Sequence, residues 1–200
     1  MCSSDLAATG CRDPPLGGGH GIAYVPPMIL PIVAGAASWT FAEYVLHRWV
    51  GHSTTSKLAF AREHREHHRQ RQYFAPWRSK LQLAVIVVGA MAVVVLPLAG
   101  LTAFAYIVSF VGTWLVYEVI HRDLHVRAPR TAIGRFLRRH HFRHHHVDPT
   151  TNHGVTSPFW DLLFRTRRPN VHVRIVRSRA PFWLAESPSD APWMPDYELI

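Results

Sequence analysis

Two long apolar runs constrain the fold of this chain more than any other feature. Residues 81–120 carry a single charged side chain, Glu118, and residues 28–46 also carry a single one, Glu43. The hydrocarbon core of a bilayer is about 30 Å thick and needs about 20 apolar residues per helix. The shorter run is therefore long enough for one membrane span, and the longer run is long enough for two.

We predict spans at 28–46, 81–97 and 101–120, with a turn between the last two that is marked by Pro97 and Gly100. The expected fold class is all-α, a multi-pass helical membrane protein with a helical cap outside the bilayer. Two crossings separate the polar segment before this hairpin from the polar segment after it. Both polar segments are therefore expected on the same membrane face.

The chain divides into three parts by composition. Residues 1–21 are rich in Gly and Pro and are expected to form a disordered lead. Residues 22–168 hold the membrane-embedded domain, and residues 169–200 form a C-terminal tail that includes a short β-prone run, Val171–Val176. A cleaved signal peptide ending near Ala36 is the alternative for the first span, but its apolar stretch is interrupted by prolines and lacks a basic leader.

The net charge of +9 is explained by the membrane topology. Of the 22 Lys and Arg residues, 21 follow the start of the first span and none lies within 81–120. Basic residues favour the cytoplasmic side of a membrane, so we expect the polar segments on the cytoplasmic face. A nucleic-acid-binding protein is the poorer explanation because the basic residues flank apolar spans, and no nucleic-acid partner is expected.

Histidine is concentrated in these polar segments, and thirteen of the fifteen histidines lie between His47 and His153. Ten of them form four boxes: His47 and His52; His64, His67 and His68; His121 and His125; and His141, His144 and His145. Residues three and four apart share one helix face, so each H-x2-H-H box is expected to direct three imidazoles the same way. His47 and His52 would diverge by about 140° on an ideal helix, so one is expected past the helix end near Gly51.

Ten imidazoles are too many for one ion, and two ions with about five nitrogens each would keep open positions. Imidazole suits iron, zinc, copper and nickel alike. Two irons that activate dioxygen at a membrane surface are the preferred interpretation. A membrane dizinc hydrolase and a non-enzymatic membrane metal-binding protein remain alternatives, although a transporter would place its ligands at mid-membrane.

Carboxylates precede two of the boxes. Glu43 lies four residues before His47, and Glu118 lies three before His121. A metal-bound imidazole usually donates its second N–H to a carboxylate or carbonyl, so both are candidates for that supporting role. The alternative is a carboxylate at a helix end in the interface. Four aromatic side chains, at Trp39, Tyr44, Trp114 and Tyr117, are candidates either to line an apolar cleft or to anchor the spans.

The four boxes, together with the run from Asn152 to Asp161 that includes Pro158-Phe159-Trp160-Asp161, resemble the fatty acid hydroxylase superfamily, which includes sterol desaturases and carotenoid hydroxylases. The resemblance covers about residues 30–167. His153 stands where that family usually has Phe or Tyr, so it and Asn152 are kept as possible supporting residues. The family often shows four spans where three are counted here.

This resemblance implies a diiron centre, dioxygen as co-substrate, and hydroxylation or desaturation of a lipid. It implies a separate electron donor of the ferredoxin or cytochrome b5 type with its reductase. The implied metal ligands are His47, His52, His64, His67, His68, His121, His125, His141, His144 and His145. His140 and His146 flank the last box as neighbours, and Asp161 is assigned a structural role. Neither the lipid nor the oligomeric state is indicated.

Overall fold

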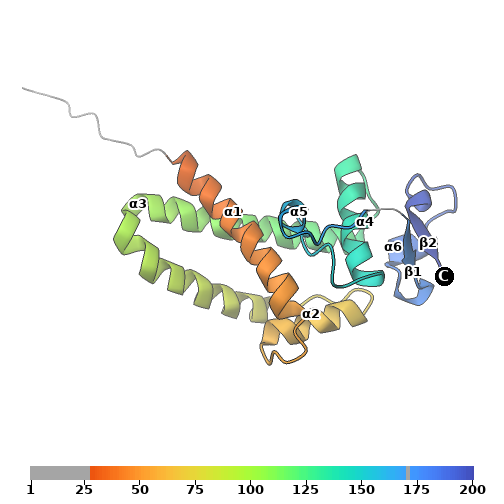
Figure 1. The fold of residues 1–200 in the computed structure, drawn as a ribbon, viewed down its shortest axis with the longest axis horizontal. Coiled ribbons are helices and arrows are strands. Elements are labelled where there is room, and N and C mark those ends of the chain that lie inside the picture. Colours follow the sequence, from red (N-terminus) through yellow and green to blue (C-terminus); the bar gives the residue numbers. More distant parts are fainter. Residues whose placement is uncertain (1–27, 170–171) are drawn as a thin grey trace, which may run out of the picture.

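The computed structural model describes residues 28–169 and 172–200 (Figure 1). The predicted lead at 1–21 lies outside the described residues. The chain order is α1 (Ile29–Val45), the π-helix η1 (Leu46–Gly51), α2 (Ala59–Arg69), α3 (Trp77–Val126), α4 (Ala132–His146), α5 (Phe159–Leu163), β1 (Val173–Ile175), η2 (Arg177–Arg179), α6 (Phe182–Ala185), η3 (Met194–Asp196) and β2 (Tyr197–Leu199).

The second apolar run forms a helical hairpin. Within α3, Gly100 has φ 52° and ψ −126°, a conformation that glycine adopts without the steric cost of a Cβ atom. The helix reverses there, three residues after Pro97, and its two limbs run back toward the same end of the molecule (Figure 1). Each limb is about 35 Å long, which matches a bilayer core. The predicted turn between two spans is confirmed.

The helix α1 packs closely on the second limb of α3. At Gly35 a Cβ atom would collide with the carbonyl oxygen of Tyr106 and lie 3.0 Å from the backbone nitrogen of Phe110. Further along, the Trp39 ring packs edge-on against Phe110, with 5.4 Å between centroids. A small residue thus lets the two backbones approach, as is common between membrane helices.

The outer faces of these helices are apolar and exposed. Ile29, Val93 and Leu98 are each more than three-quarters exposed. Two stretches, Ile29–Gly51 and Trp77–Val126, are long and apolar enough to cross a membrane. Apolar surface of this extent marks a surface that is covered by something other than water, and lipid fits helices of this length.

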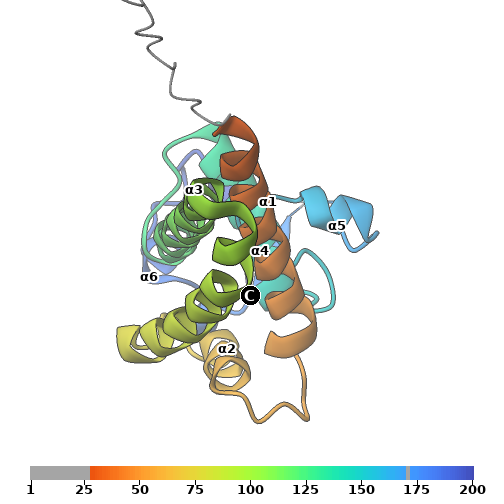
Figure 2. The same cartoon turned by 90° about the vertical axis from the view of Figure 1, so that its left-hand side faces the viewer.

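The cap is built from α2 and α4, which lie beyond the ends of the spans. Arg138 of α4 is buried, and its guanidinium donates to the carbonyl oxygens of Asp123, Arg127 and Gly134 and to the Asp123 carboxylate at 2.6 Å. These bonds hold the start of α4 against the end of α3. On the other side, α5 lies on the face of α1 that points away from α3 (Figure 2), where Trp160 packs on Phe41.

The C-terminal residues pack as an ordered unit on α4. The strands β1 and β2 pair in parallel, with Val173 opposite Tyr197. Their inner side chains form a small core with Phe142 of α4, Ala180 and Leu184. Ion pairs from Arg135 and Arg139 to Asp196 fasten the unit further. The mainly helical fold is confirmed with this one addition, and the strand falls within the predicted β-prone run.

Candidate metal centre

The ten histidines of the four boxes converge on two adjacent clusters. Within each cluster the five candidate ligand nitrogens lie within 4.8 Å of one another. The first cluster contains His47, His52, His64, His68 and His144, and the second contains His67, His121, His125, His141 and His145. The expected division into two groups of five nitrogens is therefore what the structure shows.

The boxes themselves are divided between the clusters. In α2, His64 and His68 face the first cluster, whereas His67 faces the second. In α4, His144 faces the first cluster, whereas His141 and His145 face the second. The expectation that each H-x2-H-H box directs three imidazoles one way is thus wrong. Both helices lie between the clusters. Residues four apart, such as His64 and His68, point to the same cluster, whereas residues three apart, about 60° apart around the helix axis, point to different clusters.

The π-helix η1 brings His47 and His52 together. Its hydrogen bonds join residues five apart, so positions that diverge on an α-helix come to one face. The two rings are nearly parallel, with 5.5 Å between centroids. The turn ends at Gly51, where a Cβ atom would lie 2.7 Å from His64 Cδ2. Glycine therefore lets the His64 ring into the first cluster.

The nitrogen spacing in the first cluster fits a shared ion. His144 Nε2 lies 2.8 Å from His47 Nε2 and 2.9 Å from His52 Nε2. It also lies 3.2 Å from His68 Nε2. Two imidazole nitrogens bound at 2.0–2.1 Å and at right angles are about 3.0 Å apart, so the observed separations match neighbouring ligands of one metal.

The second cluster fits an ion for a different reason. His125 Nε2 and His141 Nε2 are 2.9 Å apart. The Nε2 atoms of His67, His121 and His145 are buried and have no hydrogen-bond partner among the described residues. A buried polar atom without a partner is costly, and a metal ion would satisfy all three.

Backbone carbonyls orient several of the imidazoles. His47 Nδ1 donates to the His153 carbonyl, His67 Nδ1 to that of Tyr73 at 2.6 Å, and His144 Nδ1 to that of Thr151 at 2.7 Å. Because a carbonyl can only accept, Nδ1 carries the proton, and the Nε2 lone pair of the neutral ring points into the cluster. This arrangement is typical of metal-binding histidine.

Burial keeps the cap imidazoles in the form that binds metal. Desolvation lowers the pKa of His52 and of His67 to about 4. It lowers the pKa of His141, His144 and His145 well below the ordinary value, and neighbouring imidazoles lower it further. At neutral pH these rings are uncharged, with lone pairs available to a cation.

The supporting carboxylate at Glu43 acts through a loop. Its oxygens accept the N–H of Val155 at 2.6 Å, the N–H of Thr156 at 3.2 Å and the Thr156 hydroxyl at 2.7 Å. The same loop carries the His153 carbonyl that orients His47. Glu43 is therefore connected to His47 through the backbone of this loop, and not by the direct contact that the spacing suggests.

Asp161 fixes the other side of this loop. It is fully buried and accepts from the backbone N–H of His153 and Gly154, at 2.9 and 2.8 Å, and from His140 Nε2 at 3.1 Å. A fourth bond comes from the Thr166 hydroxyl at 2.6 Å. Burial alone would raise the pKa of Asp161, but these hydrogen bonds outweigh it, and the pKa is lowered. The structural role assigned to Asp161 agrees with this geometry.

The remaining supporting candidates lie at the edge of the site. Asn152, at φ 56°, accepts the Arg168 N–H at 2.7 Å and donates to the His140 carbonyl at 3.4 Å, so it shapes the loop. The His153 ring lies 5.2 Å from that of His144 but is not among the five nitrogens of either cluster. Glu118 accepts hydrogen bonds from Lys80 and from Trp114 Nε1. The hydroxyl of Tyr117 lies 3.4 Å from His121 Nδ1.

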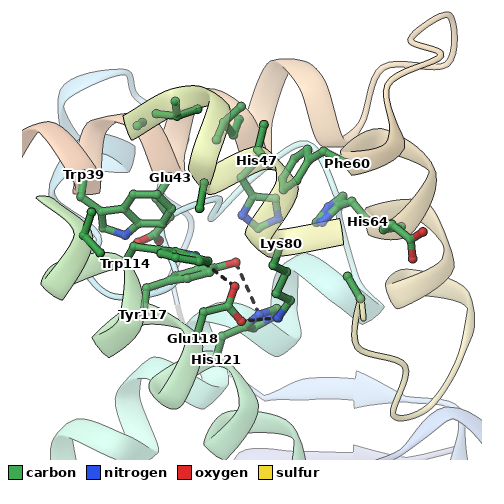
Figure 3. A pocket seen from close by; sticks show the side chains of 18 of the residues that line it. Trp39, Glu43, His47, Phe60, His64, Lys80, Trp114, Tyr117, Glu118 and His121 are labelled. Carbon is green, nitrogen blue, oxygen red and sulfur yellow. Dashed lines mark hydrogen bonds and ion pairs between the residues drawn. The ribbon is translucent and has the colours of Figure 1, made fainter. Parts of the chain in front are cut away.

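A cavity of about 390 Å³ leads from the spans to the clusters (Figure 3). Its end beside the cap includes His47, His64 and His121, and its walls include three of the four aromatic candidates, Trp39, Trp114 and Tyr117. Tyr44 is the exception among the four aromatic candidates, because its ring packs on Phe164 and its hydroxyl bonds Thr166 at 2.9 Å. The lining is mostly apolar, which suits an acyl or isoprenoid chain.

Sequence reasoning did not single out Lys80 or the orienting carbonyls. Lys80 lies at the edge of an apolar run, which is a sequence signal, but its partner Glu118 is 38 residues away. The carbonyls of Tyr73, Thr151 and His153 have no sequence signal, because every residue has one. Their role depends on the path of the loops.

Comparison with known proteins agrees with this geometry. A dihydroceramide fatty acyl 2-hydroxylase of Arabidopsis thaliana is 31% identical over 158 residues, which cover 70% of this chain and 62% of that protein. The human fatty acid 2-hydroxylase is 26% identical over 160 residues, which cover 72% of this chain and 42% of that protein. The chain therefore spans less than two thirds of the length of these relatives.

The fold is also shared with a solved structure. The structure of full-length scs7p, in which only the hydroxylase domain is visible, matches with a TM-score of 0.56 at 24% sequence identity. The match covers 72% of this chain and 57% of that chain. Residues 32–166, which contain all ten clustered histidines, match the family described as fatty acid hydroxylase. The chain belongs to the fatty acid hydroxylase family.

Proposed function

We propose that this protein is a membrane-bound diiron oxygenase that hydroxylates a C–H bond of an acyl lipid. The observation that carries the proposal is the position of the two five-imidazole clusters at the cap end of a mostly apolar cavity. The ten clustered histidines are proposed as the metal ligands. Two irons bound there would supply the activation of dioxygen.

The reaction balances with an outside reductant. One C–H bond, one dioxygen, two electrons and two protons give one alcohol and one water. The chain's own residues hold the imidazoles neutral and oriented, and the apolar cavity excludes bulk water from the reacting carbon. Desaturation shares the first hydrogen abstraction, so product analysis decides between the two outcomes.

The proposed substrate class is an acyl lipid. The Arabidopsis relatives are named as dihydroceramide fatty acyl 2-hydroxylases, and the mammalian ones as fatty acid 2-hydroxylases. The cavity of this chain lies between α1 and both limbs of α3, so an acyl chain would enter it from the bilayer. A saturated fatty acid or an N-acyl sphingoid base is the first substrate to test.

We propose that the clusters face the cytoplasm and that electrons come from a separate ferredoxin- or cytochrome b5-type carrier with its reductase. The basic cap supports both statements. Lys and Arg accumulate on the side of the spans that carries the clusters, as in cytoplasmic loops. A positive surface also favours docking of an acidic carrier.

The test combines metal analysis with isotope labelling. Protein expressed with ample iron is purified into lipid nanodiscs and assayed for metal, and it is then incubated with palmitate, a reduced ferredoxin system and oxygen-18 gas. The expected result is about two irons per chain and one labelled oxygen in a hydroxylated fatty acid. Two tightly held zincs, no labelled oxygen in any product, and cleavage of an ester- or amide-linked acyl lipid by water would overturn the proposal in favour of a hydrolase. Stoichiometric metal without any oxygen-dependent product would leave a binding protein.

A further inference from the structure

An ion pair lies in the wall of the mostly apolar cavity, whose lining also includes the carboxylates of Glu43 and Glu63. Lys80, near the start of α3, pairs through Nζ with the carboxylate of Glu118, near the end of the same helix (Figure 3). The two side chains are 18% and 13% exposed. Trp114 Nε1 donates to the second carboxylate oxygen at 3.2 Å, and Nζ lies 5.2 Å from the centre of the Trp77 ring.

The ammonium group retains unused hydrogen-bonding capacity. A lysine ammonium has three N–H donors, and Glu118 is its one acceptor within the described part of the chain. Glu118 is held by two donors, and a carboxylate with about four lone-pair sites still has room for another. Placing two charges in a poorly solvated wall is costly unless further partners complete their hydrogen bonds. Such a site favours a ligand group that accepts a hydrogen bond from Lys80.

The pair lies at the metal end of the cavity. Glu118 comes one helical turn before His121. On the other limb, Val87 lies seven residues beyond Lys80, about 10 Å deeper into the span. Val88 and Val111 also line this deeper part. The cavity is therefore polar beside the clusters and apolar at its far end.

This polarity fixes the direction of an amphipathic ligand. An acyl chain with its tail among the valines places its head group beside Lys80 and its first carbons beside the histidines. The opposite orientation would put the terminal methyl at the ion pair and the polar head among apolar side chains, which costs free energy.

We infer that Lys80 and Glu118 form the head-group subsite for the acyl substrate. Lys80 donates to the carboxylate or amide carbonyl oxygen, and Glu118 holds the ammonium in place and accepts the N–H of an amide-linked head. The pair thus selects chains with a polar head and aligns carbons near that head with the metal centre. This inference rests on the proposed function. The competing explanation is that the pair only fastens the two limbs of α3 together.

The experiment measures binding without turnover. Displacement of a fluorescent fatty acid from the iron-loaded protein in nanodiscs is measured with palmitate, palmitamide and hexadecane. Lys80→Met is compared with Lys80→Arg, which keeps the cation. Because a lone buried carboxylate could unfold the first variant, the double variant Lys80→Met/Glu118→Leu, with neither charge, is included. Metal content and melting temperature are recorded for all of them.

We expect wild type to bind palmitate and palmitamide at least about tenfold more tightly than hexadecane. The two variants without the cation should lose this preference, Lys80→Arg should keep it within about threefold, and metal content should be equal. In turnover, KM should rise more than kcat falls, and the oxidised position should spread along the chain. A preserved preference in the folded double variant would overturn the inference. Head-selective binding without any oxygen-dependent product would instead refute the proposed function and leave the subsite standing.

Discussion

The imidazoles of His68 and His145 stack face to face, with 3.9 Å between ring centroids and 3° between planes. They belong to different clusters. Their contact shows that the two clusters share a wall, made by α2 on one side and α4 on the other. Ring contacts such as His67–His68 and His144–His145, within one helix each, join the clusters as well.

The first prediction concerns metal stoichiometry. His144 lies centrally in the first cluster, within 3.2 Å of three other ring nitrogens, and His145 lies in the second. His144→Ala should lower bound metal from about two ions to about one per chain, and so should His145→Ala. Hydroxylation should fall at least about a hundredfold in both. Metal analysis of protein purified under identical conditions measures the change.

The matched control is His172→Ala, because His172 is exposed and lies outside both clusters. It should keep full metal and activity. Unchanged metal in His144→Ala would refute the assignment of the first cluster. Loss of both ions from each single variant would show that the clusters do not load independently.

The histidine spacing predicted which residues gather but not how they are shared. The sequence shows ten imidazoles in four boxes, and this number requires two sites. The division of His67 from His64 and His68 depends on the crossing of α2 and α4 between the clusters, which periodicity within one helix does not contain. His52 follows the end of the helix at Gly51, as predicted, but the widening to a π-helix that brings it beside His47 was not predicted.

The spans were predictable because apolar length is a local property of the sequence, and Gly100 marked the reversal. The supporting contacts were less accessible. Glu43 was singled out by its spacing from His47, but its hydrogen bonds reach the loop at Val155, 112 residues away. The C-terminal unit was predicted only as a tail, since its core includes Phe142 from a distant helix. Long-range packing of this kind leaves little trace in a single sequence.

The second prediction tests Glu43 as a positioning residue. Glu43→Gln keeps the shape of the side chain but replaces one acceptor oxygen with an NH2 group, a donor that would face the N–H and O–H donors of Val155 and Thr156. The free energy of unfolding should fall by about 1–3 kcal/mol. Because the loop carries the His153 carbonyl, the ion at the first cluster should be lost before the ion at the second during titration with a chelator.

Glu186→Gln is the control for this change, since Glu186 is exposed in the C-terminal unit. It should not alter melting or chelator sensitivity. Equal loss of both ions from Glu43→Gln would contradict the path through His153. Wild-type behaviour would show that the loop needs no carboxylate.

The third prediction concerns acid stability and Asp161. Its lowered pKa means that the ionised form is favoured more in the folded chain than in the unfolded chain. The resulting stability is fully present above the unfolded pKa, about 3.9, and is lost as the pH falls through the folded value. Asp161→Asn should therefore cost about 1–3 kcal/mol at neutral pH. The difference from wild type should narrow below about pH 3.9.

Thermal melts in detergent from pH 3 to pH 8 would measure this difference, with the metal removed from both proteins. A constant difference between pH 5 and pH 8 is expected, because Asp161 stays ionised in both states there. A difference that grows as the pH falls would have the wrong sign for a carboxylate with a lowered pKa, and it would refute this account of the loop.

The fourth prediction compares two glycines in the spans. A Cβ atom at Gly35 would meet the backbone of the second limb of α3, whereas one at Gly89 would have nothing within 4 Å. Alanine is intrinsically favoured over glycine in a helix by about 0.5–1 kcal/mol. Forcing a methyl group into a close contact costs about 1–3 kcal/mol, which outweighs that gain. Gly35→Ala should therefore lower the melting temperature, and Gly89→Ala should leave it unchanged or raise it.

Both variants keep every clustered histidine, so metal content measured beside the melts separates a packing defect from a ligand defect. If Gly35→Ala were as stable as Gly89→Ala, the close approach of α1 to α3 would be wrong, and with it the placement of His47 opposite His144.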